Sequence, residues 1–515
     1  MRSDTRGAAA NPLIYEIDTW PWLERLGRAT GRPADLAAVP PAAWDGLAEL
    51  GVDAVWLMGV WRRSPAGTAI ATADEGNMAD FRRALTDLAP GDVVGSAYCV
   101  REYLVDDRLG GRAGLAAARR ALADRGMGLI LDFVPNHVAP DHPWTVDHPE
   151  YFVAGSGEDL ARDPRSFVRA GDHVLACGRD PYFPAWADVA QLDAFSPGLR
   201  EAAIATLTEI LDQCDGVRCD MAMLMLTEVF ARTWGDRVAP APPTEYWSDV
   251  IGAVRLAHPE AILIAEAYWD LEWRLQQLGF DYCYDKRLYD RLVHGDAESV
   301  RLHLCADPAY QQGLVRFVEN HDEPRATSAF PGGRHKAAAV AALTQPGARL
   351  VHDGQLEGRR VRLPVFLGRV PDEPPDPDLQ RWYRALLGVL RRPALRSGRW
   401  ELCERWGWPG NDRSDQLVAW SWEGAAPAET GADLDRWLVV VNLGPDTAEG
   451  QVTVPPGWGD LRGRALRLLD PVHDIAFDRS GDELLDGLYV QLDPWGSHQF
   501  SIQLAPREPD RREEP

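Results

Sequence analysis

Eight short apolar segments recur along the chain, and helix-forming stretches separate many of them. Continuous apolar strands with helices between them are typical of a parallel sheet that is buried on both faces. Eight such strands are the number that a closed (β/α)8 barrel, or TIM barrel, requires. The segments cover residues 13–18, 52–60, 127–135, 216–220, 261–268, 280–285, 314–320 and 348–354.

The connecting stretches support this α/β prediction. Residues 111–126 and 197–214 have the composition and periodicity of amphipathic helices. An open, doubly wound sheet is the alternative, and it would carry a glycine-rich phosphate loop after its first strand. The sequence has no such loop after residue 18. The pattern therefore favours a closed barrel.

Two regions depart from the strand and helix alternation. Residues 138–195 are too irregular for a single crossover helix and predict a small inserted domain at the barrel mouth. After residue 398 the strands alternate in polarity and are rich in tryptophan, which predicts a C-terminal antiparallel β-sandwich over 398–515. The barrel then comprises residues 1–137 and 196–397. The last residues, REPDRREEP, lack apolar anchors and predict a frayed tail.

Charge and cysteine content exclude several classes of function. The chain has 54 basic and 78 acidic residues and a net charge of -24, so it repels the phosphates of nucleic acids and membranes. A neutral or cationic ligand is expected instead. Seven scattered cysteines form neither a disulfide framework nor a zinc motif. No apolar run is long enough to cross a membrane, and MRSDTRGAAANP lacks a secretory pattern, so we expect a cytoplasmic protein.

Acidic and polar residues follow four of the predicted strands. The carboxyl ends of barrel strands form the active-site face, so these side chains are expected to converge there. Arg218 and Asp220 are two residues apart, and on a strand this spacing points both side chains the same way. The guanidinium of Arg218 is therefore expected to keep Asp220 ionised.

Two further acids complete a candidate catalytic set. Cleavage of a glycosidic bond needs one ionised carboxyl group to attack and one protonated group to release the leaving oxygen. Glu266 lies in the apolar run AILIAEAYW, where loss of solvent favours its acid form. Asp322, from the segment FVENHDEPR, is expected to hold the sugar hydroxyls in the transition state.

At these segments the chain resembles the α-amylase family of glycoside hydrolases. The resemblance rests on DFVPNH, GVRCDMAML, EAYW and FVENHDEPR in the family's order, together with the opening YEID. It implies that Asp220 is the nucleophile, Glu266 the acid/base and Asp322 the transition-state stabiliser. It also implies that His137, Arg218 and His321 bind the sugar at the cleavage position. Tyr98 aligns with a tyrosine on which the family stacks that sugar.

Two positions depart from patterns of the family. Leu224 replaces a histidine that ligates calcium in many amylases, so we expect no cofactor, although calcium remains an alternative. Gly95 replaces an acid that exo-acting oligosaccharide hydrolases often carry three residues before the stacking tyrosine, which disfavours a strict non-reducing-end glucosidase. Asp132 is expected to hold its loop and not the substrate.

The sequence predicts a retaining hydrolase of α-linked glucosides, with a carbohydrate as its partner molecule. A transglycosylase that moves α-glucosyl units is the first alternative, because both reactions pass through the same covalent intermediate. A non-catalytic barrel scaffold is a second, since fold alone does not specify activity. A metal-dependent hydrolase is a third, but His137 and His321 form no metal-spaced pair.

Overall fold

The computed structural model describes residues 11–426 and 434–505. Its centre is a closed barrel of eight parallel strands in the order β1-β14-β13-β12-β11-β10-β5-β2. Each of the eight predicted segments supplies one strand, so the barrel prediction is confirmed. The strands are β1 (Leu13–Asp18), β2 (Ala54–Met58), β5 (Gly128–Phe133), β10 (Gly216–Cys219), β11 (Ile262–Ala265), β12 (Tyr282–Tyr284), β13 (Leu314–Arg316) and β14 (Ala348–His352).

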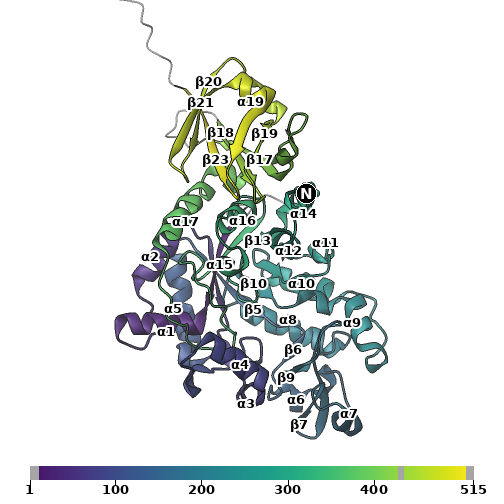
Figure 1. The fold of residues 1–515 in the computed structure, drawn as a ribbon. Helices are drawn as coiled ribbons and strands as arrows, with labels where there is room; N and C mark the ends of the chain where they lie inside the picture. The colour runs from purple at the N-terminus through teal and green to yellow at the C-terminus, as the bar shows by residue number, and fades with distance from the viewer. Residues whose placement is uncertain (1–10, 427–433, 506–515) are drawn as a thin grey trace, which may run out of the picture.

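Helices surround the barrel strands (Figure 1). Where a helix begins, the sequence supplies its start signals. In α8, Pro197 occupies the first turn and the Ser196 side chain accepts a hydrogen bond from the Leu199 amide. The main helices are α1 (Thr19–Thr30), α2 (Pro41–Glu49), α5 (Gly111–Ala123), α8 (Pro197–Leu211), α10 (Tyr246–Ala257), α12 (Lys286–His294), α16 (Arg334–Leu343) and α17 (Pro377–Leu390).

An excursion between β2 and β5 adds further elements. It contains α3 (Pro65–Ala73), α4 (Glu75–Ala84) and an antiparallel pair formed by β3 (Trp61–Arg63) and β4 (Val100–Val105). The loop from β3 to β4 carries Ser96 and Tyr98. The barrel register brings Arg218 of β10 opposite Asp132 of β5 and Ile264 of β11. Strand pairing thus places the segment that precedes Asp220 beside the segment that precedes Glu266.

The predicted insertion forms an antiparallel sheet in the order β6-β9-β8-β7. Its strands are β6 (His137–Val138), β7 (Phe167–Ala170), β8 (His173–Gly178) and β9 (Trp186–Gln191). The sheet has a separate apolar cluster that includes Val138, Phe152 and Leu175. Figure 1 shows it beside the barrel, at the opposite end of the molecule from the C-terminal strands.

The C-terminal region consists of two antiparallel sheets, as predicted. The larger has the order β15-β17-β18-β23-β20-β21, and the smaller has the order β16-β19-β22. Their strands are β15 (Arg399–Leu402), β16 (Arg405–Trp406), β17 (Leu417–Ala425), β18 (Leu434–Asn442), β19 (Ala448–Val452), β20 (Ala465–Asp470), β21 (Ile475–Ser480), β22 (Leu488–Leu492) and β23 (Ser497–Leu504). Trp422 joins this region to the barrel, because its indole N–H donates to the backbone oxygen of Thr344 at 2.8 Å.

Two of the sequence predictions are not settled by this fold. The domain boundaries at 137, 195 and 397 stay predictions, although the inserted and C-terminal sheets lie within the predicted ranges. The predicted tail REPDRREEP is residues 507–515, which lie outside the described residues. Within residues 11–426 and 434–505, no helix combines the length and the apolar character needed to span a bilayer.

Candidate active site

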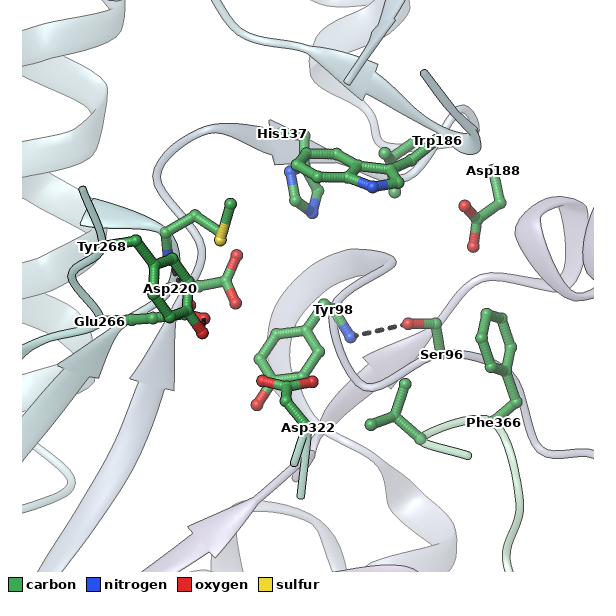
Figure 2. A pocket seen from close by; sticks show the side chains of 13 residues that line it. Ser96, Tyr98, His137, Trp186, Asp188, Asp220, Glu266, Tyr268, Asp322 and Phe366 are labelled. Atoms are coloured by element: carbon green, nitrogen blue, oxygen red, sulfur yellow. Dashed lines mark hydrogen bonds between the residues drawn. The ribbon is translucent and has the colours of Figure 1, made fainter. Parts of the chain in front are cut away.

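A pocket of about 350 Å³ lies at the carboxyl ends of the barrel strands. The lining includes five of the predicted site residues, which are Tyr98, His137, Asp220, Glu266 and Asp322. Figure 2 shows Asp220 and Glu266 together at one end, with Asp188 and Phe366 at the other. Tyr98 and Asp322 lie between these ends. The structure therefore gathers all three predicted catalytic acids around one cavity.

The Arg218 side chain lies beneath Asp220 and Glu266 and joins them. One of its terminal nitrogens is 2.8 Å from Oδ1 of Asp220, and the other is 2.7 Å from Oε2 of Glu266. Arg218 is 0% exposed, and its Nε donates to the Tyr284 hydroxyl at 3.3 Å. Arg218 directs its donors at these buried neighbours, and it does not line the pocket. The predicted sugar contact of Arg218 stays a prediction, and in this structure the side chain anchors two carboxyl groups.

Glu266 has three hydrogen-bond donors around its carboxyl group. Besides Arg218, the backbone amide of Met221 donates to Oε2 at 2.6 Å, and the Tyr268 hydroxyl donates to Oε1 at 2.7 Å. Burial raises the pKa of Glu266, the charges of Asp220 and Asp322 raise it further, and Arg218 opposes them, with a result of about 7. A carboxyl group with this pKa can both give and take a proton near neutral pH.

Met221 adopts a left-handed backbone conformation with a φ of 41°. This region is unfavourable for residues other than glycine, and such strain is maintained only where surrounding contacts fix it. Here the conformation accompanies the Met221 amide bond to Glu266. The turn after Asp220 therefore links the position of the candidate nucleophile to that of the candidate acid.

Asp220 has a pKa raised above its ordinary value, because burial outweighs the lowering effect of Arg218. The sequence analysis predicted that Arg218 would keep this carboxyl group ionised. The structure modifies that expectation, because one guanidinium also serves Glu266 and lies 3.6 Å from Asp132. Asp220 still makes the close contact with Arg218 that its spacing predicted.

Asp322 differs electrostatically from the other two acids. Burial raises its pKa, but the His321 imidazole, 2.9 Å from Oδ2, outweighs burial and brings the pKa to about 2. The Asp322 side chain is 44% exposed, whereas those of Asp220 and Glu266 are 8% and 3% exposed. Asp322 therefore offers a stable negative charge at the pocket surface.

His321 is buried and is absent from the pocket lining, and its predicted sugar contact stays a prediction. Tyr98 and His137 do line it. The Tyr98 ring stacks on the His321 ring at 5.3 Å, and its hydroxyl lies 2.8 Å from Nε2 of His321. His137 lies beside Trp186, with ring centroids 5.3 Å apart.

Asp132 has the structural position that was predicted for it. It is 2% exposed and accepts hydrogen bonds from the Trp56 indole at 3.2 Å and the Gly59 amide at 3.4 Å. Burial raises its pKa to about 6. Asp132 does not line the pocket, so it supports the neighbouring strands and Arg218 from below.

Several pocket residues were missed in the sequence. Trp186 and Asp188 come from β9 of the insertion, and Phe366 comes from the loop that follows β14. Neither segment carries a recognisable pattern. Tyr268 had a usable signal, because it lies two residues after Glu266 in the segment EAYW.

A second pocket of about 390 Å³ shares Met221 and Tyr268 with the first. Its lining includes Phe183 and Trp269. Trp269 has a φ of 65°, another left-handed conformation. The two pockets meet on the Glu266 side, where a leaving group would depart.

Calcium has no evident place at the predicted position, since Leu224 is 2% exposed within the apolar core. Among the described residues, two side-chain groups could offer three ligands each to a metal, which are Asp470, His473 and His498, and Glu16, Asp18 and His352. Neither group lines the pocket. In the second group the guanidinium of Arg325 lies 2.7 Å from Nδ1 of His352, and this neighbouring positive charge disfavours a metal cation there.

Comparisons with known proteins place this pocket among related barrels. No family model matches the chain. The curated α-amylase MalA of Haloarcula japonica is 26% identical over 326 residues, which are 62% of this chain and 41% of that protein. α-Amylase 3 of Dictyoglomus thermophilum is 20% identical over 277 residues, 49% of this chain and 50% of that protein. The matched region thus spans half or less of these relatives.

Solved structures match almost the whole chain. The maltogenic α-amylase AmyB of Thermotoga neapolitana aligns with a TM-score of 0.65 and 18% identity over 96% of this chain and 99% of that one. An α-amylase of Lactobacillus plantarum gives 0.65 and 19% over the same shares. Cyclic α-maltosyl-(1→6)-maltose hydrolase of Arthrobacter globiformis gives 0.62 and 18% over 97% and 100%. These likenesses establish the fold.

Fold and pocket together define a (β/α)8-barrel protein with three carboxyl groups at its strand ends. The fold class predicted from the sequence, with its insertion and antiparallel C-terminal sheets, is confirmed. The curated relatives that the chain resembles are both named α-amylases, in line with the resemblance seen in the sequence, and the solved structures share the barrel fold.

Proposed function

We propose that this protein is a retaining glycoside hydrolase of α-linked glucosides, such as maltooligosaccharides or related α-glucans. The observation that carries the proposal is the shared contact of Asp220 and Glu266 with Arg218 at the pocket floor. Two carboxyl groups held on one guanidinium are close enough to act on the same glycosidic bond. The pKa of Glu266, about 7, suits an acid that later acts as a base.

In the proposed first step the Asp220 carboxylate attacks C1 of the glucosyl unit. The bond from C1 to the leaving oxygen breaks, and Glu266 gives its proton to that oxygen. In the second step a water molecule loses a proton to the Glu266 carboxylate and adds to C1, which releases Asp220. Two inversions at C1 restore the α configuration.

Positive charge develops on the sugar in both transition states. Asp322 faces the same pocket with a pKa of about 2 and therefore stays ionised. We assign it the stabilising role, since a fixed negative charge in a partly desolvated pocket favours an oxocarbenium-like centre. The Tyr98 ring offers a face for the sugar, and His137 a polar group beside it.

The named activities of relatives agree with this substrate class. They include maltogenic α-amylase and a cyclic maltosyl-maltose hydrolase. A transglycosylase is the second candidate, because Trp269 and Phe183 line the pocket on the leaving-group side. Aromatic side chains there offer apolar faces to an acceptor sugar.

We also propose a cytoplasmic location and no requirement for a metal. All seven cysteines are free thiols, which suits a reducing compartment. The Leu224 side chain offers no oxygen or nitrogen ligand where a calcium-binding histidine would stand.

A substrate panel tests the proposed function. The purified chain is incubated with maltooligosaccharides, isomaltose, trehalose, sucrose and starch, and the products are separated by chromatography. Shorter sugars alone indicate hydrolysis, and additional longer sugars indicate transfer. Cleavage of none of these glucosides would contradict the proposal.

A further inference from the structure

His321 lies between two carboxyl groups from distant parts of the chain. Its Nδ1 is 2.5 Å from Oε1 of Glu16 on β1, and its Nε2 is 2.9 Å from Oδ2 of Asp322. The Tyr98 ring stacks on one face, and Trp56 meets the ring edge-on with centroids 5.5 Å apart. The imidazole therefore has a single orientation, set by groups on three segments.

The two contacts also constrain where the protons lie. Ionised carboxyl groups only accept hydrogen bonds, so a proton on each ring nitrogen is what lets His321 serve Glu16 and Asp322 together, with the Tyr98 hydroxyl, 2.8 Å from Nε2, as a competing partner of that nitrogen. His321 is then a cation. Burial lowers its pKa, but Asp322 and Glu16 raise it well above the ordinary value. Asp18 and Asp132, which also interact electrostatically with His321, act in the same direction.

We propose that Glu16 is a positioning residue for the reaction, and that it holds His321 in the doubly protonated form and orientation that fix Asp322 at the pocket. The link to catalysis rests on the proposed function. Glu16 itself is 0% exposed and is absent from the pocket lining, so it acts through His321 and not on the sugar.

The surroundings of Glu16 support this role. Among the described residues its Oε2 has no hydrogen-bond partner, so the contact of Oε1 with His321 is the hydrogen bond that the side chain makes there. A buried carboxyl group with one hydrogen bond is costly unless a charge compensates it. His321 supplies that charge, with His352 as the next cationic neighbour.

The substitution Glu16→Gln separates charge from shape. The glutamine oxygen can still accept from Nδ1, so the ring keeps its place, but His321 now loses a proton near neutral pH. The neutral ring keeps the proton on Nδ1 and turns the lone pair of Nε2 towards Asp322. Asp322 then loses its hydrogen bond and its neighbouring positive charge, while the Tyr98 hydroxyl can donate to Nε2.

The first test compares pH profiles of maltooligosaccharide hydrolysis. We expect Glu16→Gln to lower kcat at least about tenfold at alkaline pH, the scale on which partners that orient a functional imidazole act. The alkaline limb should move to lower pH, and KM should change less than kcat. Asp285→Asn is the matched control, because Asp285 is a buried partner of His303 at 3.0 Å outside the pocket lining.

The proposal is overturned if Glu16→Gln keeps the alkaline limb of the unaltered protein and loses activity only in proportion to its folded fraction. A limb that moves equally in Asp285→Asn would also overturn it. Thermal unfolding of both variants supplies the folded fractions.

A second measurement needs neither a Glu16 variant nor activity. In protein labelled with ¹⁵N-histidine, the His321 signals are assigned by their absence in His321→Gln. We expect both ring nitrogens to stay protonated through the pH range in which an unperturbed histidine, with a pKa of about 6.5, becomes neutral. Neutral His321 in this range would overturn the proposal. A protein that cleaves no glucoside but shows this cation would instead disprove the proposed function.

Discussion

The backbone amide of Met221 donates to the Glu266 carboxyl group at 2.6 Å. Met221 directly follows Asp220, so the backbone turn that carries the candidate nucleophile also holds the candidate acid. Because of this contact, a change in the backbone at Asp220 would also change the position of the Glu266 carboxyl group. The effects expected on replacing Asp220 or Glu266 therefore depend on each carboxyl group and not only on the fold.

Replacing the nucleophile should abolish turnover. Asp220→Asn removes the attacking carboxylate but keeps its size, so we expect kcat to fall by several orders of magnitude with the fold retained. Circular dichroism and steady-state kinetics on maltotetraose measure both. Asp249→Asn, on helix α10 at an ion pair with Arg200, is the control and should keep its activity. Near-normal activity of Asp220→Asn would refute the assignment.

Replacing the acid should depend on the leaving group. Glu266→Gln cannot give a proton, so cleavage of maltooligosaccharides should be lost while the first step on activated aryl glucosides, which need no proton, is spared. Pre-steady-state release of the phenol measures that step. Equal losses on both kinds of substrate would argue against acid catalysis by Glu266.

The alkaline limb of the pH profile should report Glu266. The acid form is needed for leaving-group departure, so kcat/KM should fall as pH rises through about 7. The Tyr268 hydroxyl lowers the pKa of Glu266 through its hydrogen bond. Tyr268→Phe should therefore raise that pKa and move the alkaline limb to higher pH. A limb that stays in place or moves to lower pH would show that another group sets it.

The anomeric configuration of the first product should show whether the reaction passes through a covalent intermediate. Retaining enzymes hold their two carboxyl groups about 5 to 5.5 Å apart and form a covalent intermediate. We expect ¹H nuclear magnetic resonance to detect the α anomer before mutarotation. Initial release of the β anomer would mean direct attack by water, and Asp220 would then be a base.

Chelation should leave the activity unchanged. The side chain of Leu224 provides no ligand for calcium, and the carboxyl groups of the pocket have proposed roles that need no metal. Activity after dialysis against EDTA should equal that of the untreated protein, and added calcium should have no effect. A loss that calcium restores would identify a metal site elsewhere in the chain.

Much of the barrel could be predicted because its information is local. Each strand is a short apolar run whose burial on both faces leaves little choice of structure, as in β5 with Leu129, Ile130 and Leu131. The three acids end such runs or directly follow them. Strand-end position together with the family resemblance was therefore enough to predict that Asp220, Glu266 and Asp322 lie at one pocket.

The remaining features depend on contacts between distant segments. Sequence spacing linked Arg218 to Asp220 but could not show that Glu266 shares the same guanidinium. The Glu16 contact with His321 joins residues 305 positions apart. Arg218 and His321 are also buried below the pocket surface. Neighbouring carboxyl groups accept hydrogen bonds from them there. Such sharing follows from tertiary packing and has no periodic signature.

The β9 strand of the insertion contributes Trp186 and Asp188 to a cavity whose reactive groups belong to the barrel. The inserted sheet has its own apolar cluster, while Phe167 and Ala176 also join the main core. Evolution or a protein engineer can therefore exchange this module for another and reshape the cavity wall. The three acids and Arg218 would stay in place. Substrate selectivity could therefore change without a change in the catalytic groups.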